Sequence, residues 1–394
     1  MPVFLKDGGK NAIFGTALSE FSDEIERLIS IIDTEIPIPP RFAHKLPHEI
    51  AELSRLLTQA RPERGGAYLS SARVLSAYSR YFLPWNVLRL CALLASPSLR
   101  NEITKRLADG GAALDFGSGP ATFPLALWIA CPELRSKKLN IIASDQNKFV
   151  LNAGRRLFTA FTGGPWKFSA KPVRFEDYVG PRSQLVSSIN LLNEVFWKIP
   201  QADTSALTIC AQKTAKRFAN ALSEGGAALI VEPGIPRASQ YLGFLKKAFR
   251  ELGLFTRYPC PQEVVCPMCG GRKGTKWCHF KISAEGAPPK LQTLSSESVS
   301  RKESLTLSFI FVSGGAAESE NSGVPEKGVR VISGIFPLPD GKTGRYGCSC
   351  YGLTLLRASK HTLDTVKPGA FLEINSSARE RDPKTGALII DLDT

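Results

Sequence analysis

The sequence has no long apolar runs, and this absence excludes the usual membrane-spanning proteins. None of its hydrophobic stretches approaches the roughly 18 consecutive apolar residues that a transmembrane helix needs. The first residues, MPVFLKDGGKNAIFGTALSEF, contain one early lysine and no apolar stretch before a small-residue cleavage site, so no secretory signal is indicated. These absences predict a soluble cytoplasmic protein.

Acidic residues are also in deficit. The 394 residues include 36 Asp and Glu against 50 Lys and Arg, a formal net charge of +14 at pH 7. A basic balance of this size is common in proteins that bind nucleic acid, although a merely basic protein without such a partner is the open alternative. Nine cysteines without an export signal argue against a disulfide scaffold, and clustered cysteines then indicate metal ligands or redox groups.

Internal repeats are absent too, and the pattern of apolar residues divides the chain into four regions. Apolar residues at three- and four-residue spacing predict helices between residues 46 and 110, one of which Pro84 should kink or divide. Short apolar runs then alternate with helix-like segments, which predicts a parallel sheet with helices on both faces. The expected regions are a helical region (1–110), an α/β unit (111–258), a cysteine-rich segment (259–283) and a C-terminal β-rich domain (284–394).

A glycine-rich turn opens the α/β unit at LDFGSGPATFPLALWIA, residues 114–130. It lacks the Lys-Ser/Thr ending of a phosphate-binding P-loop, and Pro120 and Thr122 break the dinucleotide-binding pattern. Gly117 and Gly119 allow a tight turn that a ligand can approach closely. Asp145 ends the next predicted strand, IIASD, where its carboxylate could accept hydrogen bonds from ribose hydroxyls.

This arrangement resembles the class I methyltransferases that use S-adenosylmethionine (SAM). The resemblance implies a Rossmann-like α/β fold in which the Asp-x-Gly-x-Gly turn lies under the methionine and ribose of the cofactor. It also implies that the acidic residue after the second strand holds the ribose, and that the FEDY segment (175–178) contacts the adenine. The implied cofactor-binding residues are Asp115, Gly117, Gly119, Asp145 and, as alternatives in FEDY, Glu176 or Asp177.

The sequence lacks the motif that amino-group methyltransferases carry after strand four, Asn/Asp-Pro-Pro-aromatic. It also has no cysteine where a pyrimidine methyltransferase would place its nucleophile. INLLNEVF, residues 189–196, occupies the strand-four position, so Asn193 and Glu194 are the candidate catalytic residues. The alternative interpretation is that they cap the helix that follows the strand.

Four of the nine cysteines lie in CPQEVVCPMCGGRKGTKWCHF, residues 260–280. Only Cys266 and Cys269 form a Cys-x-x-Cys pair, whereas a zinc ribbon usually has two such pairs. Cys260 and Cys266 each precede a proline, which is frequent at iron–sulfur ligands. Zinc and an iron–sulfur cluster both accept four thiolates, so the spacing alone does not separate them.

The order EPGIP, CPQEVVCP and WCHF after a SAM-type domain is similar to the Rsm twenty-two family, which is associated with the small ribosomal subunit. The resemblance implies a 4Fe–4S cluster held by Cys260, Cys266, Cys278 and a cysteine of the GCSC strand, Cys350 first and Cys348 as its alternate. Cys269 departs from the family pattern, and a local site that includes it would favour zinc or a different cluster register.

The cysteine segment is basic, and Arg272, Lys273 and Lys276 are the candidate RNA-binding residues; a solvated charged face is the alternative. The expected function is a monomeric, SAM-binding, iron–sulfur protein that acts on the small ribosomal subunit or its rRNA, as a methyltransferase or as an assembly factor. In a eukaryote it would lie in the mitochondrial matrix. The alternative is a zinc-stabilised RNA-binding protein with a vestigial nucleotide pocket.

Overall fold

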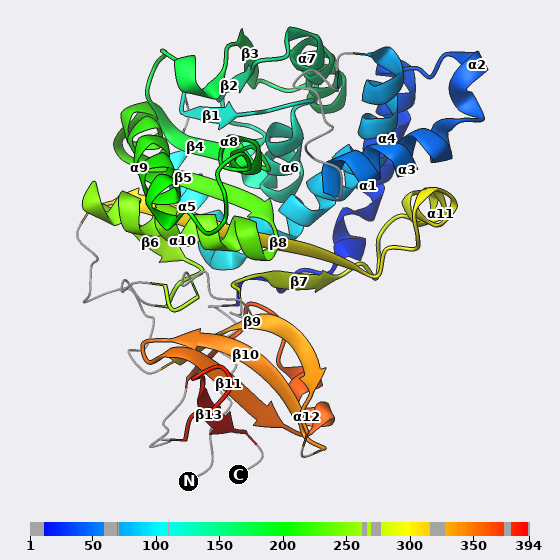
Figure 1. Cartoon of the computed structure of the whole chain (residues 1–394). Coiled ribbons are helices and arrows are strands. Elements are labelled where there is room, and N and C mark those ends of the chain that lie inside the picture. Colours follow the sequence, from blue (N-terminus) through cyan, green and yellow to red (C-terminus); the bar gives the residue numbers. More distant parts are fainter. Residues whose placement is uncertain are drawn as a thin grey trace.

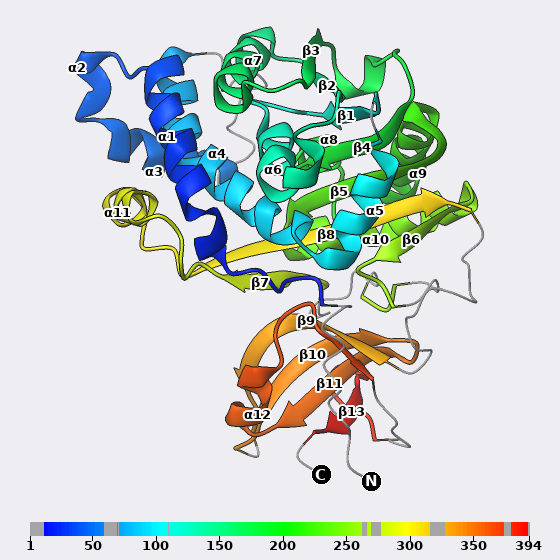
Figure 2. The ribbon, with the colours of Figure 1, turned by 180° about the vertical axis from the view of Figure 1, so that it is seen from behind.

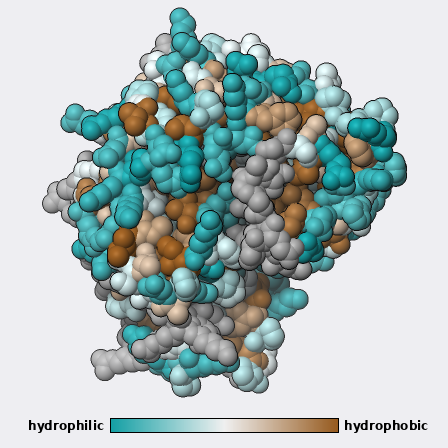
Figure 3. Space-filling view, turned by 45° about the horizontal axis from the view of Figure 1, so that its top comes forward, coloured by the Kyte–Doolittle hydropathy of each residue, from teal (hydrophilic) through white to brown (hydrophobic). Residues whose placement is uncertain are grey.

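The computed structural model contains two β-sheets, with most of the helices packed around the larger one (Figures 1 and 2). The larger sheet has eight strands and the smaller sheet has five. The structure describes residues 12–58, 69, 71–108, 110–261, 266–268, 277–315, 328–339, 341–373 and 380–392. Figure 3 shows one face that is mainly hydrophilic, with hydrophobic residues gathered in small patches.

The N-terminal region is helical, as the apolar spacing predicts. Ile25, Leu28 and Ile32 recur at three- and four-residue spacing and are fully buried, because they share one face of the first long helix. Pro84 lies inside the longest helix, which continues through it, so the expected division does not occur. The elements are η1 (Leu18–Phe21), α1 (Ser22–Glu35), α2 (Pro40–Ala43), α3 (Leu46–Thr58), α4 (Ala72–Leu94) and α5 (Pro97–Arg106).

The large sheet has the order β3-β2-β1-β4-β5-β8-β6, with β7 also paired to β8. The first five strands of this order run parallel, and β8 lies antiparallel between β5 and β6. The strands are β1 (Ala112–Phe116), β2 (Asn140–Asp145), β3 (Lys167–Pro172), β4 (Ser183–Ile189), β5 (Leu222–Pro233), β6 (Leu254–Tyr258), β7 (Phe280–Ser283) and β8 (Ser304–Gly314).

Helices cover both faces of this sheet, so its central strands are apolar on both sides. The helices α9 and α10 pack on one face (Figure 1), and α4, α6 and α7 pack on the other (Figure 2). The helices and 3-10 turns within this unit are α6 (Thr122–Ala130), η3 (Pro132–Leu134), α7 (Lys148–Thr162), η4 (Phe175–Asp177), α8 (Leu192–Val195), α9 (Thr204–Ala221), α10 (Pro236–Glu251) and α11 (Pro289–Ser298).

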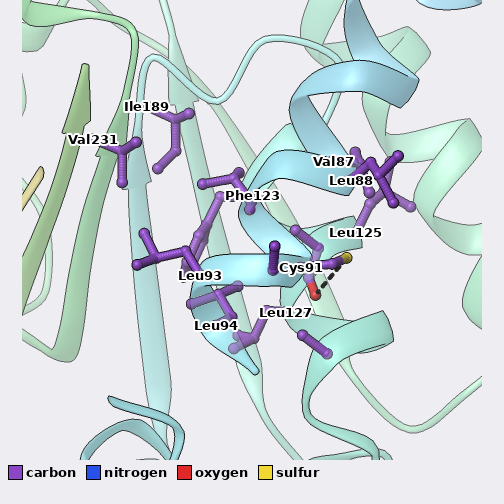
Figure 4. Packing of buried hydrophobic residues seen from close by; sticks show 14 of the residues in the cluster. Val87, Leu88, Cys91, Leu93, Leu94, Phe123, Leu125, Leu127, Ile189 and Val231 are labelled. Atoms are coloured by element: carbon purple, nitrogen blue, oxygen red, sulfur yellow. Dashed lines mark hydrogen bonds between the residues drawn. The ribbon is translucent and has the colours of Figure 1, made fainter. Parts of the chain in front are cut away.

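The long helix α4 is anchored in the centre of the core (Figure 4). Its residues Leu93 and Leu94 pack with Phe123 of α6, beside Ile189 of β4 and Val231 of β5. Among the described residues, no single helix has the length and apolar content of a membrane span. The helices α4 and α5 have that length and apolar content only when they are counted together, and they are bent by 92° relative to each other. The packing fixes α4 against the sheet.

The smaller sheet starts later than the sequence predicts. The C-terminal β domain was expected from residue 284, but β7 and β8 pair within the large sheet. Leu305, Leu307, Phe309 and Phe311 of β8 pack in one core cluster and Ile310 and Val312 pack in the other, because successive side chains of a strand point to opposite faces. The separate β unit therefore begins near β9.

The five-stranded sheet has the order β12-β9-β10-β11-β13 and lies below the large sheet in Figure 1. The segment before η1 links the two units, since Ile13 N–H donates to Gly369 O at 3.1 Å and the Phe14 ring lies 5.4 Å from that of Phe280. The elements of the smaller β unit are β9 (Gly328–Pro337), β10 (Thr343–Ser349), β11 (Gly352–Ala358), α12 (Lys360–Thr365), β12 (Phe371–Glu373) and β13 (Leu388–Asp391).

Candidate cofactor and metal sites

The glycine-rich turn follows β1 and leads into α6. Gly117 and Gly119 have positive φ angles of 66° and 54°, which favour glycine. A Cβ added at Gly117 would lie 2.9 Å from the Leu191 side chain. Ala121 is also left-handed, with φ 67°, at the start of α6. The turn therefore lies at the carboxyl end of β1 in a conformation that needs glycine at both positions.

Asp145 is the last residue of β2 and lies beside the glycine-rich turn at the same edge of the sheet. Its Oδ2 accepts a hydrogen bond from Gly119 N at 3.1 Å, and its Oδ1 accepts one from Asn147 N at 2.8 Å. Burial raises the pKa of this carboxyl, and the two backbone donors oppose the rise. Each carboxylate oxygen has capacity for a second hydrogen bond, so Asp145 can still accept hydroxyl donors from a ligand.

Asp115 lies beneath the turn and is almost fully buried. Its Oδ1 accepts from Ser187 Oγ at 2.7 Å, while its buried Oδ2 has no hydrogen-bond partner among the described residues. Ser118 lies near enough to lower the pKa of Asp115, yet its hydroxyl is not in hydrogen-bond geometry with that oxygen. Burial nevertheless raises the pKa of Asp115 to about 7. A cationic ligand group would offset this burial, and SAM carries both an ammonium and a sulfonium.

The two FEDY acids lie at the rim of this edge. Glu176 and Asp177 are exposed within η4, and Glu176 Oε2 is 3.7 Å from Arg174 Nε. Between β3 and these acids, Val173 N donates to Asp145 O at 3.1 Å. Phe175 is buried against Phe116, with ring centroids 5.0 Å apart. The segment is thus held beside Asp145, and both acidic side chains stay open to solvent.

The Asn193 side chain donates two hydrogen bonds at the start of α8. Its side-chain amide donates to Glu232 Oε2 at 2.9 Å and to Asn190 O at 2.6 Å. The buried Glu232 carboxylate also accepts from Leu192 N and Asn193 N, so it caps the start of α8. The cap of α8 is therefore the Glu232 carboxylate, and the roles predicted for Asn193 stay predictions. Glu194 is partly exposed and lies near Tyr78, whose pKa it helps to raise.

Sequence reasoning missed the face of α4 that borders this edge. Tyr78, Phe82 and Asn86 are the partly exposed positions in the otherwise buried middle of the helix, and their four-residue spacing places them on one face. Burial and then the Glu194 and Asp145 carboxylates raise the pKa of Tyr78 to about 12, while a hydrogen bond with Asn86 lowers it. The four-residue spacing of these three positions was visible in the sequence, but ordinary core packing gives the same spacing.

Four predicted cysteines line one cavity between the two β units. Its empty volume is about 490 Å³, including space open to solvent. Cys260 and Cys266 follow β6, Cys278 precedes β7, and Cys348 comes from β10 of the smaller sheet. The other lining side chains include two cations, Lys246 of α10 and Arg330 of β9.

The cavity suits a cation that binds thiolates. Burial raises the pKa of the Cys278 thiol well above its ordinary value, and the nearby thiols of Cys260, Cys266 and Cys348 raise it further. A thiolate is the form that binds metals, and a bound metal cation reverses this cost. Ser308 Oγ donates to Cys278 O at 2.6 Å, which fixes the backbone there. The donor set therefore fits a thiolate-bound metal centre.

The structure distinguishes the two candidates for the fourth ligand. Cys348 is buried in β10, opposite Arg330 in the ladder, and it lines the cavity. Cys350, the first choice from the sequence, follows the end of β10 in a turn, is exposed and does not line the cavity. The strand ends at Ser349, so the alternation that would place both cysteines on one face stops before Cys350.

The remaining predicted residues lie outside the described part of the chain: Cys269, Arg272, Lys273 and Lys276. Within residues that the structure does describe, no group of three or more His, Cys, Asp or Glu side chains is arranged to hold a metal ion as it stands. The four thiols share a cavity, and metal binding would have to draw them together.

Residues 210–328 match the model of a family described as mitochondrial small ribosomal subunit Rsm22. The match begins in α9, includes the cysteine segment and ends at the start of β9. It confirms the resemblance that the cysteine motifs indicate, over this part of the chain. None of the curated proteins compared with the chain matches it.

Several solved methyltransferases resemble the structure distantly. Magnesium protoporphyrin IX methyltransferase from Synechocystis, solved with bound SAH, is 9% identical, with a TM-score of 0.35 over 68% of this chain and 100% of that one. A SAM-dependent methyltransferase from Clostridium acetobutylicum is 12% identical, with a TM-score of 0.33 over 68% and 99%. A methyltransferase from Pyrococcus furiosus is 14% identical, with a TM-score of 0.29 over 41% and 73%. These scores are too low to carry an argument, so the fold assignment depends on the strand order itself.

Proposed function

We propose that the protein is a SAM-binding methyltransferase that acts on RNA of the small ribosomal subunit. The observation that carries the proposal is the edge of the parallel sheet where Asp115, the Gly117–Gly119 turn and Asp145 meet. Ligands of open α/β sheets bind at the carboxyl ends of the strands. The match to the small ribosomal subunit family and the net charge of +14 support an RNA partner.

Each residue of this edge has a role in the proposal. When bound, SAM supplies an electrophilic methyl group. The Gly117–Gly119 turn would lie against its methionine portion, Asp145 would accept the ribose hydroxyls, and Asp115 Oδ2 would face a cationic group. Tyr78 and Glu194 would border the acceptor side, where they can position the group that receives the methyl.

Thiolates of Cys260, Cys266, Cys278 and Cys348 would hold a 4Fe–4S cluster in the second site, with zinc as the competing occupant. The support is the shared cavity and the two prolines that follow Cys260 and Cys266. Lys246 and Arg330 line the same cavity and would offset the negative charge of the thiolates. Since the ligands come from both β units, the metal would fasten the smaller sheet to the larger one.

A second function is favoured by the contacts of Asn193. Its amide is committed to Glu232 and Asn190, and no other motif supplies the Asn/Asp that amino-group methyltransferases use. An assembly factor that binds SAM and RNA without transferring the methyl would have this arrangement. Incubation of the full chain with methyl-labelled SAM and small-subunit RNA separates the two: label in the RNA supports the enzyme, and binding of both ligands without label supports the assembly factor.

The first test concerns SAM binding. Asp145→Ala removes the hydroxyl acceptor, so we expect it to weaken SAM binding by about 1–3 kcal/mol in titration calorimetry. Asp177→Ala is the matched control, because Asp177 is an exposed carboxylate near the same edge. Thermal unfolding of the unliganded variants should show that both are folded. Unchanged affinity in folded Asp145→Ala would contradict the ribose assignment.

The second test concerns RNA. Changing Arg272, Lys273 and Lys276 to Glu should weaken binding of small-subunit RNA strongly and flatten its dependence on salt, since fewer counterions are released. The measurement is RNA affinity across a salt series.

A charge-matched control reverses Lys213, Lys216 and Arg217 of α9 instead. We expect a much smaller effect there, because α9 lies over the face of the large sheet rather than in the cysteine segment. Equal losses in the two triple variants would show a nonspecific effect of net charge, and the RNA surface would then have to be sought elsewhere.

A further inference from the structure

Lys302 is a cation without a carboxylate partner. It precedes β8, and among the described residues no Asp or Glu lies within ion-pair distance of its Nζ. The Nζ instead lies over the rings of Tyr81 and Trp85, 5.5 Å from each centroid. Burial, and then the charge of Arg89, lower the pKa of Lys302 to about 8. The structure therefore holds an ammonium group where only aromatic faces balance it.

Arg89 supplies a second cation beside Lys302. Its Nη1 donates to Thr306 O at 3.0 Å and its Nη2 donates to Asn190 Oδ1 at 3.2 Å. The side chain is only 8% exposed, and its buried Nε has no hydrogen-bond partner among the described residues. The carboxylate that affects it, Glu232, already accepts three hydrogen bonds at the start of α8. The pair Lys302 and Arg89 is therefore a locally positive site.

This pair lies at the edge of the sheet where the candidate cofactor site is. Because β8 runs antiparallel to β5, its first residues lie beside the carboxyl end of β5, with Leu307 opposite Pro233. Arg89 bonds Asn190, which follows β4, and its charge lowers the pKa of Tyr78, which also senses Asp145. The charges of Asp145 and Arg89 thus both act on Tyr78, and the charge of Arg89 also acts on Lys302.

We infer that Lys302 and Arg89 bind a backbone phosphate of the RNA substrate beside the methyl donor. This inference rests on the proposed function and names the part of the substrate that Lys302 and Arg89 recognise. Lysine and arginine N–H groups make charge-assisted hydrogen bonds to phosphate oxygens, which are stronger than neutral ones. A bound phosphate would give Lys302 the anionic partner that it lacks, and the charge of the buried Arg89 guanidinium would add to the attraction.

The aromatic stripe of α4 explains why a nucleotide suits the site better than a free anion. Tyr78 and Phe82 stack with ring centroids 5.6 Å apart, and both keep some exposed surface. Unpaired bases stack on such rings, and each stacked base contributes about 1–3 kcal/mol. A phosphate on Lys302 and a base on this stripe would place a nucleotide between the cations and the cofactor edge.

The test compares Lys302→Gln with two controls, using fluorescence anisotropy of a short, labelled single-stranded RNA. Lys302→Gln removes the charge but keeps a polar side chain, and we expect about tenfold weaker binding, as for the loss of one strong contact. The slope of log affinity against log salt should fall by about 0.7, the value for one phosphate on a single strand. Lys302→Arg should keep most of the affinity, and Lys290→Gln, an exposed lysine on α11, should keep all of it.

A second probe isolates the phosphate. On an oligonucleotide with an uncharged methylphosphonate backbone, wild type and Lys302→Gln should bind alike. SAM affinity, measured in parallel, should be the same in all four proteins. If Lys302→Gln binds the charged RNA with wild-type affinity and salt slope, the inference is overturned and the proposed function stands. If the wild type binds SAM but no RNA, the proposed function itself fails, and the phosphate site fails with it.

Discussion

Replacing Cys348 with serine should remove the metal, whereas replacing Cys350 with serine should leave it bound. Cys348 is buried, lines the thiol cavity and lies opposite Arg330, while Cys350 is exposed beyond the end of β10. A serine oxygen is a poorer ligand for zinc and for iron–sulfur centres than a thiolate. We expect near-complete loss of metal from Cys348→Ser purified without oxygen, and wild-type content in Cys350→Ser.

The readouts are iron, sulfide and zinc per chain together with the visible absorption spectrum. Equimolar iron and sulfide with a brown colour would support the 4Fe–4S proposal. Stoichiometric zinc without sulfide would replace it with the zinc alternative and keep the ligand assignment. Full metal content in Cys348→Ser would refute that assignment, and Cys269→Ser would then be the next variant to examine.

Replacing Asp115 with asparagine should stabilise the unliganded protein above pH 7 and weaken SAM binding. Burial raises the pKa of Asp115 in the folded protein to about 7 from its ordinary value of 3.8. Between those values the unfolded chain has lost this proton while the folded chain keeps it, so folding stability falls as pH rises through the window. One pKa unit corresponds to about 1.36 kcal/mol, so the total loss is on the order of 4 kcal/mol.

Asparagine is uncharged at every pH and avoids that loss, so the stability difference between variant and wild type should grow from pH 4 to pH 7 and then level off. Denaturant unfolding across this range measures the difference. Asp177→Asn, an exposed carboxylate, serves as the control and should show no such growth. SAM binding at pH 8 should weaken by tenfold or more in Asp115→Asn, because the anionic partner of the cationic ligand is gone. A flat stability difference would mean that Asp115 is ionised at little cost.

The local parts of the candidate cofactor site could be predicted from sequence because each depends on a few neighbouring residues. A glycine with a positive φ angle and an acid after a strand are local features, and Gly117, Gly119 and Asp145 lie together as expected. The pairing of β8 with β5 depends on residues far apart in the chain. No local pattern in the β8 sequence SFIFV indicates which of the two sheets this strand will join.

The same limit explains why the sequence could not show that α4 continues through Pro84, or which of Cys348 and Cys350 lines the cavity. Proline usually breaks a helix because it lacks an N–H group, yet α4 is buried along nearly its whole length, and its packing outweighs the missing bond. The choice between Cys348 and Cys350 depends on where β10 ends, and strand ends are set by partner strands. The α4 residue Trp85 and Lys302 could not be linked from sequence, since more than 200 residues separate them and only the fold brings them together.

The position of β8 also determines when the large sheet can be completed during synthesis. Since β8 is the strand that joins β5 to β6, a nascent chain that has not yet reached Ser304 has β5 with an open edge and β6 with no partner in the sheet. Open edges pair with other chains and aggregate. The cysteine segment lies in the loop that must close before β8 can insert, and loop closure costs entropy that grows with loop length. Ribosome-bound chains that end before β8 should therefore need chaperones.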